Sequence, residues 1–228
     1  MMIDLSAWTP RKPPQKTAME GRYVRLEPLS ATKHAEGLFA ASATADGEER
    51  FRWLGEGAPT TPDAFRQWLE KVEASADPLW FTVIDKASGV IAGRQTFMRT
   101  DTANGVTEIG NILWNPPVAR KPAATEALYL FARHAFDDLG YRRFEWKCNN
   151  RNSPSKRAAL RFGFTFEGVF RQHLIVKGLS RDTAWFSIID SEWPLLRAAF
   201  EAWLDPANFD ASGNQRERLE DIRDRLRG

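Results

Sequence analysis

The chain has 228 residues, of which 43% are hydrophobic, and its formal net charge at pH 7 is +2. A chain of this length and composition can bury one sizeable core, with or without extensions. The near balance of charge argues against a general nucleic-acid-binding protein, which would carry a clustered excess of Lys and Arg.

The cysteine and histidine content sets further limits. Cys148 is the only cysteine, so no internal disulfide is expected, and the three histidines are too scattered for a Cys/His metal site. No apolar run reaches the ~18 residues of a membrane span, and the N-terminus does not have the pattern of a signal peptide. These features predict a cytoplasmic protein without a bound metal or a membrane partner.

The first third of the chain begins with an irregular segment. Residues 1–19 are rich in Pro, Arg and Lys and predict an extended arm. Residues 22–29 alternate apolar and charged side chains, which is typical of a strand buried on one face. Ser30 is the expected N-cap of a helix to about Ala43. Residues 46–59 predict a polar loop with aromatic residues, either a helical turn or a lid over a substrate.

A helix and three strands follow. The run Thr61-Pro62-Asp63 predicts a helix start, with a first-turn proline, for a helix to about Ala74. Strands are expected at residues 79–84, 90–98 and 106–114, separated by turns, so they should be antiparallel neighbours.

The second half alternates strands and helices. A helix ends at Gly140, and Asn152-Ser153-Pro154 begins another that ends at Gly163. Strands are expected at residues 142–148, 165–175 and 182–189, and helices at residues 192–203 and within the charged last ~25 residues. This order of elements predicts an α+β fold with a mixed sheet.

One stretch of this order suggests an anion site. Residues 108–139 predict a strand, then a proline-rich basic break, then a helix. The first turn of a helix has backbone N–H groups without internal partners, and phosphate binds there readily. The alternative is a plain connecting loop with a solvated Arg-Lys pair.

Several motifs in order resemble a known family. They lie at residues 118–127, 152–155, 162–168, 181–183 and 192–194. Together they resemble the GNAT superfamily of acetyl-CoA-dependent N-acyltransferases, and within it the Rim-type (RimJ/RimL-like) branch of ribosomal-protein N-terminal acetyltransferases. The resemblance implies a mostly antiparallel central sheet of about seven strands, flanked by helices and splayed between the fourth and fifth strands. It covers residues 20–195, between an arm at 1–19 and a helical extension at 196–228.

The resemblance implies coenzyme A at the helix start, but the loop departs from the family pattern. Arg120 and Pro122 stand where glycines are usual, and Pro122 lacks an N–H. The pantetheine of the cofactor would lie in the splay, and an amide near Leu113 or Trp114 would stabilise the oxyanion. The residues implied to contact acetyl-CoA are Leu113, Trp114, Val118, Arg120, Lys121, Ala123, Ala124, Thr125, Asn149, Asn152 and Ser155.

Three side chains are candidates for proton transfer. Glu108 precedes the expected thioester position on its strand and is the first candidate base, the alternative being a strand-end ion pair. His173 is the second, the alternative being a hydrogen-bonded core histidine. The resemblance places the Ser155 hydroxyl near the sulfur, where it would stabilise or protonate the thiolate; otherwise it bonds the backbone.

Two departures from the family keep the function open. Ala159 stands where many members carry a tyrosine acid, and Leu174 where the Rim-type branch carries a glutamate base. The predicted function is transfer of an acetyl group from acetyl-CoA to a primary amine of a protein N-terminus or small molecule. The alternatives are a non-catalytic coenzyme A-binding or regulatory protein and a ribosome- or RNA-associated module. A homodimer is left open.

Overall fold

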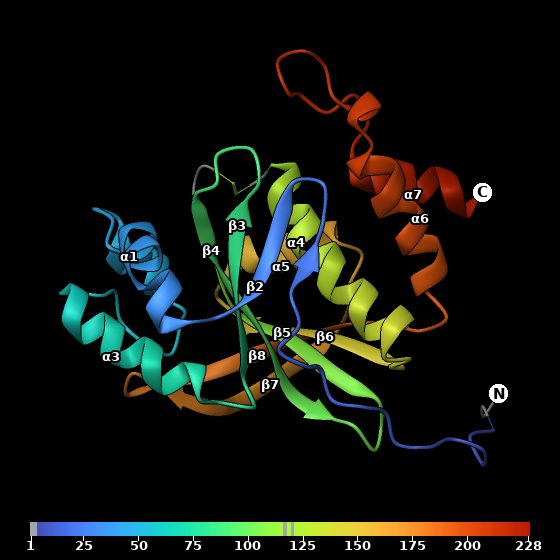
Figure 1. The fold of residues 1–228 in the computed structure, drawn as a ribbon. Helices are drawn as coiled ribbons and strands as arrows, with labels where there is room; N and C mark the ends of the chain where they lie inside the picture. The colour runs from blue at the N-terminus through green and yellow to red at the C-terminus, as the bar shows by residue number, and fades with distance from the viewer. Residues whose placement is uncertain (1–3, 116–117, 120) are drawn as a thin grey trace.

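A computed structural model of the chain describes residues 4–115, 118–119 and 121–228. Its centre is one sheet of eight strands in the order β1-β2-β3-β4-β5-β6-β8-β7 (Figure 1). All neighbouring strands are antiparallel except β5 and β6, which run parallel. The predicted α+β fold with a mixed, mostly antiparallel sheet is confirmed, and the strand beyond the expected seven is the two-residue β1, Met19–Glu20.

The first half of the chain supplies five strands and three helices. After β1 these are β2 Val24–Pro28, α1 Ala31–Ser42, α2 Gly47–Phe51, α3 Pro62–Glu73, β3 Leu79–Asp85, β4 Ile91–Asp101 and β5 Val106–Trp114. The predicted start of α3 is confirmed, because the Thr61 hydroxyl accepts the Ala64 N–H at 3.3 Å and Pro62 occupies the first turn.

The second half supplies three strands and four helices. They are α4 Pro122–Arg133, β6 Arg143–Asn149, α5 Ser153–Arg161, β7 Thr165–Val176, β8 Leu179–Ile189, α6 Trp193–Leu204 and α7 Leu219–Arg227. A π-helical turn, His134–Asp138, continues α4, and a 3-10 turn, Pro206–Asn208, follows α6. The helix ends at Gly140, whose φ of 66° favours glycine, as the sequence predicts.

The two faces of the sheet carry different helices (Figure 1). On one face α4 packs through a column of aromatic rings: Phe97 and Phe131 stack 3.8 Å apart, and Phe81 meets both edge-on. On the other face α1 and α3 form a smaller core with Leu38, Leu69 and Trp80 at its centre. The second face is the one that carries the polar side chains described below.

The chain ends on the α4 face. The larger core includes buried side chains from Met19 of β1 to Ile222 of α7, so α6 and α7 pack with the strands and with α4. In the arm, residues 4–18 form no helix or strand, and the Trp8 indole donates to the Ala103 carbonyl at 2.7 Å. The division into an arm, a central domain and an extension stays a prediction.

The sheet opens between β5 and β6. The two strands pair from Val106↔Arg143 to Ile109↔Trp146, and no pairing between them continues beyond that point within the described residues. β6 itself remains paired with β8 as far as Asn149↔Thr183. Without the short strand β1, β5 and β6 are the fourth and fifth strands along the chain. The predicted splay is therefore present, and it separates the last residues of β5 from those of β6.

Candidate active site

A β-bulge accompanies the splay. In β5 the register passes from Thr96↔Gly110 to Arg94↔Leu113, so Asn111 and Ile112 together oppose one residue of β4. Asn111 has a φ of 49°, a conformation that asparagine tolerates better than most residues. Because a bulge bends the strand that carries it, it turns the end of β5 away from β6.

The gap between the strands forms a cavity of about 140 Å³. Its walls come from the ends of β5 and β6, the start of α5 and the loop after α2. Among the candidate residues, the cavity brings together Glu108, Asn149, Asn152 and Ser155, whereas His173 is not part of its lining. Trp53 and Leu54 contribute from the loop that the sequence suggests as a lid.

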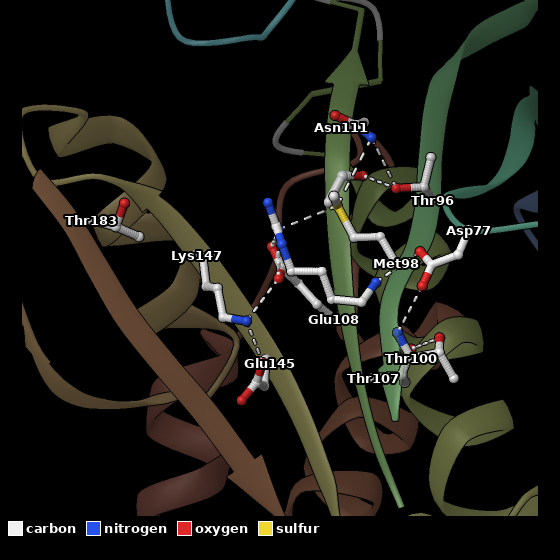
Figure 2. Close-up of polar contacts among 12 residues, drawn as sticks. Asp77, Thr96, Met98, Thr100, Thr107, Glu108, Asn111, Glu145, Lys147 and Thr183 are labelled. Carbon is white, nitrogen blue, oxygen red and sulfur yellow. Dashed lines mark hydrogen bonds and ion pairs between the residues drawn. The ribbon is translucent and has the colours of Figure 1, made fainter. Parts of the chain in front are cut away.

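Glu108 is the buried carboxylate of this cavity, with 2% of its surface exposed. One oxygen lies 2.9 Å from Nη1 of Arg99 and 3.0 Å from Nζ of Lys147. Figure 2 shows Lys147 pointing between Glu108 and Glu145, and its Nζ is 2.5 Å from the Glu145 carboxylate. The carboxylate faces the cavity, as a general base would, and it is also ion-paired. The structure is therefore compatible with both interpretations of Glu108 from the sequence, a base and a strand-end ion pair.

Arg99 reaches Glu108 because of a second bulge, in β4. Met98 pairs with Glu108 and Asp101 with Val106, so Arg99 and Thr100 oppose a single residue. The Asp77 carboxylate accepts the N–H groups of Arg99 at 2.8 Å and Thr100 at 3.1 Å (Figure 2). Asp77 therefore fixes the backbone from which the Arg99 guanidinium extends over the cavity.

Ser155 lies in the first turn of α5, with its hydroxyl in the cavity wall. The Asn152 side chain caps the helix by accepting the Ser155 N–H at 3.2 Å. The Trp146 indole donates to Ser155 Oγ at 3.0 Å, which leaves the hydroxyl proton of Ser155 available to another acceptor. Burial raises the pKa of the neighbouring Cys148 thiol, so Cys148 is a neutral wall residue and a poor nucleophile.

His173 stands beside the cavity on β7. Its Nδ1 is 3.1 Å from the Thr183 hydroxyl, and its ring lies against Phe170 and Trp185. Burial and then the charges of Arg181, Arg99 and Lys147 lower the pKa of His173 below its usual value. The imidazole is accordingly neutral at physiological pH.

The end of β5 presents one backbone amide to the gap. The Asn115 N–H donates to the Ala92 carbonyl of the neighbouring segment at 2.8 Å. Successive N–H groups of a strand point to opposite sides, so the Trp114 N–H is directed toward the gap and that of Leu113 toward β4. Trp114 is held in this position by its indole, which donates to Gln95 Oε1 at 3.1 Å.

The start of α4 offers a site for an anion. The Lys121 N–H donates to the Val118 carbonyl at 3.0 Å, and the Thr125 N–H approaches the Lys121 carbonyl at 3.5 Å. Pro122 has no N–H, so the amides of Ala123 and Ala124 are those left at the helix start. Arg120, a further predicted contact, lies outside the described residues.

A larger pocket of about 710 Å³ adjoins this helix start. It lies between α4, α5 and the segment after α6, and its walls include Arg157, Arg161, Trp203 and Phe209. Arg161 donates to the Thr125 hydroxyl at 3.1 Å, and burial lowers its pKa. Two cations beside a helix N-terminus and two aromatic rings are groups that bind a nucleotide phosphate and its base.

The sequence reasoning missed several polar residues of this site. Arg157 and Arg161 could have been found from their spacing, because residues four apart lie on one face of a helix. Lys147 and Arg99 carried no such signal, since the strand order and the bulge of β4 bring them to Glu108.

Two further features are absent from the described residues. No cluster of three or more His, Cys, Asp or Glu side chains in residues 4–115, 118–119 and 121–228 has the arrangement of a metal site. Within the same part of the chain, no helix has the length and apolar character needed to cross a membrane.

Comparison with known proteins agrees with this geometry. Residues 24–165 match the family described as "Acetyltransferase (GNAT) domain". The structure is similar to that of a GCN5-related N-acetyltransferase from Brucella melitensis, with a TM-score of 0.94 and 60% identity over 95% of this chain and 98% of that one. It is also similar to a probable GNAT-family acetyltransferase from Chromobacterium violaceum, with a TM-score of 0.78 and 37% identity over 85% and 96% of the two chains.

Curated relatives are more distant. The uncharacterized N-acetyltransferase p20 of Bacillus licheniformis is 30% identical over 117 residues, which are 50% of this chain and 63% of that protein. The chain therefore matches less than two thirds of that relative's length.

Proposed function

Because this chain belongs to the GNAT acetyltransferase family, we propose that it moves the acetyl group of acetyl-CoA to a primary amine by direct attack in a ternary complex. The observation that carries the proposal is the cavity in the β5–β6 gap, which is lined by both Glu108 and Ser155. The acceptor is a protein N-terminus or a small molecule.

The proposed cofactor path runs between two pockets. Both pockets are lined by the end of β5 and the first turns of α5. Trp114 and Pro154 line the larger pocket, and Ile112 and Ser155 line the cavity. The larger pocket suits the nucleotide end, with its phosphates at the Ala123 and Ala124 amides, the Lys121 side chain and the two arginines. Val118, Thr125, Asn149 and Asn152 complete the proposed contacts.

The residues of the chain then meet the demands of acyl transfer. Acetyl-CoA supplies the activated thioester. Glu108 accepts a proton from the ammonium group of the acceptor, directly or through water, and the resulting neutral amine attacks the thioester carbonyl to form the new C–N bond. The Trp114 N–H donates to the oxyanion, and the Ser155 hydroxyl donates toward the thiolate when the C–S bond breaks.

The Rim-type branch is part of the proposal. The Asn152 cap and the Ser155 hydroxyl at the cavity support it. Leu174 in place of a glutamate on β7 distinguishes this chain from that branch, and we assign the base to Glu108 on β5 instead. The acceptor need not be a ribosomal protein.

We further propose a cytoplasmic homodimer. Five large apolar side chains of the β7–β8 hairpin are exposed, at the end of the sheet where β7 has a neighbour on one side: Phe166, Phe170, Ile175, Leu179 and Ile189. Exposed apolar groups on an edge strand favour association with another chain. Light scattering after size exclusion tests the dimer.

Turnover separates the proposal from its alternatives. Acetyl-CoA is incubated with a panel of amines and peptides, and free thiol is measured. Amine-dependent thiol release supports the transferase, whereas acetyl-CoA binding without release by any acceptor supports a non-catalytic coenzyme A-binding protein. Steeply salt-dependent RNA affinity that is lost on deletion of residues 1–19 would support the ribosome- or RNA-associated alternative.

A further inference from the structure

The charged groups around the cavity form a series of ion pairs in which the positive and negative charges are equal in number. Arg99 contacts Glu108, Glu108 contacts Lys147, Lys147 contacts Glu145, and Glu145 contacts Arg143, which also contacts Glu167. These are three cations and three carboxylates, so their formal charges cancel. Among the described residues, Glu108 is the only carboxylate that lines the cavity, and its charge is already compensated within this series of ion pairs.

Arg181 is the remaining charge in the cavity wall. It extends from β8, and its Nε donates to the Thr183 hydroxyl at 3.2 Å. Within the described part of the chain, no Asp or Glu oxygen lies within ion-pair distance of its guanidinium. The cavity therefore has an excess positive charge, and the terminal nitrogens of that guanidinium have no carboxylate partner there.

The pKa shift of His173 is consistent with this excess charge, whereas the lowered pKa of Arg181 is mainly an effect of burial. The charges of Arg181, Arg99 and Lys147 act in the same direction as burial on His173. His173 thus lies in a positive local field, in which a carboxylate or phosphate would be stabilised.

A positive cavity restricts the acceptor. A simple amine arrives mainly as an ammonium ion, which the excess charge repels. An amine that also carries an oxyanion brings a compensating charge, and a guanidinium binds carboxylate and phosphate with two parallel hydrogen bonds. The same field favours the neutral form of the amine, which is the form that attacks the thioester.

We infer that the acceptor is a small amine bearing a carboxylate or phosphate group, and that Arg181 binds this group. The inference rests on the proposed acetyl transfer and names its substrate class. Arg181 is then a specificity-determining residue, and Glu108 and Arg181 contact the two ends of the same acceptor. A protein N-terminus has no such group beside its amine, except where an acidic side chain supplies one.

Binding tests the inference separately from catalysis. The full-length protein is saturated with coenzyme A and titrated by calorimetry with matched amines: the common amino acids against their amides, and O-phosphoethanolamine against ethanolamine. The first series supplies a carboxylate and the second a phosphate. In at least one series, we expect the member with the anionic group to bind about 10- to 100-fold more tightly than its partner without one.

Two variants show whether Arg181 is responsible. Arg181→Gln should remove the preference and leave the dissociation constant of coenzyme A unchanged. Arg171→Gln, which removes an exposed arginine of the same hairpin outside the cavity, should leave the preference intact. Equal binding of the amines with and without an anionic group in both series would overturn the inference. So would a weakened coenzyme A affinity in Arg181→Gln with the amine preference retained.

Thiol release from acetyl-CoA is measured on the same panel. A bound anionic amine that is never acetylated would contradict the proposed transfer and leave the anion site standing. Acetylation without any preference for the anionic member would contradict the inference and leave the proposed transfer standing.

Discussion

Nζ of Lys147 lies 3.0 Å from Oε2 of Glu108, and the two side chains are 5% and 3% exposed. The pair joins neighbouring parallel strands at the place where they begin to separate. A buried carboxylate needs a partner to offset its desolvation, and here it has two cations. The ion pair thus allows a carboxylate to remain at the base of the cavity, within reach of an amine.

The first prediction concerns the base. Glu108→Gln should lower kcat/KM by about 10²- to 10⁴-fold, the range for loss of a general base, with the dissociation constant of acetyl-CoA little changed. His173→Gln should lower it by less than about tenfold. Steady-state kinetics of the two variants decide between the candidates, and the reverse ranking would assign the base to His173.

A matched control shows whether Glu108→Gln acts by removing the base or by displacing Lys147. Glu145→Gln also removes a carboxylate partner of Lys147, but Glu145 does not line the cavity. If Glu145→Gln were as inactive as Glu108→Gln, the effect would be one of positioning Lys147.

The second prediction concerns Ser155. Ser155→Ala should lower kcat while leaving KM for acetyl-CoA nearly unchanged, because the hydroxyl is needed when the thiolate departs. Trp146→Phe removes the indole that donates to Ser155 Oγ and keeps the hydroxyl. Should Trp146→Phe reproduce the whole loss in kcat, Ser155 would act through packing of α5 and not on the sulfur.

The third prediction concerns the nucleotide end. Arg157→Gln and Arg161→Gln should each weaken acetyl-CoA binding by about tenfold, or ~1.4 kcal/mol, through loss of a cation beside phosphate. Lys86→Gln is the control, because Lys86 lines a separate pocket of about 680 Å³ on the other side of the α4 start. The affinity for acetyl-CoA is measured by calorimetry. If Lys86→Gln lost this affinity and neither arginine variant did, the nucleotide would lie in that pocket instead.

The fourth prediction concerns the pH dependence of stability. His173 has a lowered pKa in the folded chain, so it binds its proton more weakly there than in the unfolded chain, and protonation favours unfolding. Its contribution is present above the unfolded pKa of about 6.5 and is lost as the pH falls through the folded pKa. Relative to His173→Gln, the wild type should therefore lose free energy of unfolding between pH 8 and pH 5.

Urea unfolding of the two proteins at both pH values measures this difference. A gap between wild type and His173→Gln that is independent of pH would show that the environment of His173 does not disfavour its protonated form.

The fifth prediction concerns the loop after α2, which covers the cavity through Trp53 and Leu54. Arg94 is fully buried, lies over the rings of Trp68 and Trp80, and contacts Glu56 of this loop. Glu56→Gln leaves a buried guanidinium without its carboxylate and should destabilise the fold by about 3–5 kcal/mol.

The double variant Glu56→Gln with Arg94→Met is the control, because it removes the charge as well as its partner. It should recover part of the lost stability in urea unfolding. If the double variant were less stable than Glu56→Gln alone, packing of Arg94 on the rings would outweigh its unpaired charge.

Much of the fold was predictable from local patterns. The starts of α3 and α5 follow from a capping side chain and a first-turn proline, and the strands from alternation and turn residues. These signals act within a few residues of chain, so a single sequence reveals them. The splay between β5 and β6 was predicted only through the resemblance to a family, and their parallel pairing was not predicted, because it joins segments separated by α4.

The site was less predictable for the same reason. Glu108 and Ser155 were identified from position and motif, and both line the cavity. The partners of Glu108 were not, because Lys147 reaches it across the parallel pair and Arg99 reaches it from a bulge held by Asp77. That Arg181 has no carboxylate partner can be recognised only when all ion pairs around the cavity are known.

The most direct test of the account is a crystal structure of the complex with acetyl-CoA. We expect the pyrophosphate at the amides of Ala123 and Ala124, the pantetheine between β5 and β6, and the thioester beside Ser155 and Glu108. A pyrophosphate bound away from the start of α4, or a thioester outside the β5–β6 gap, would contradict it.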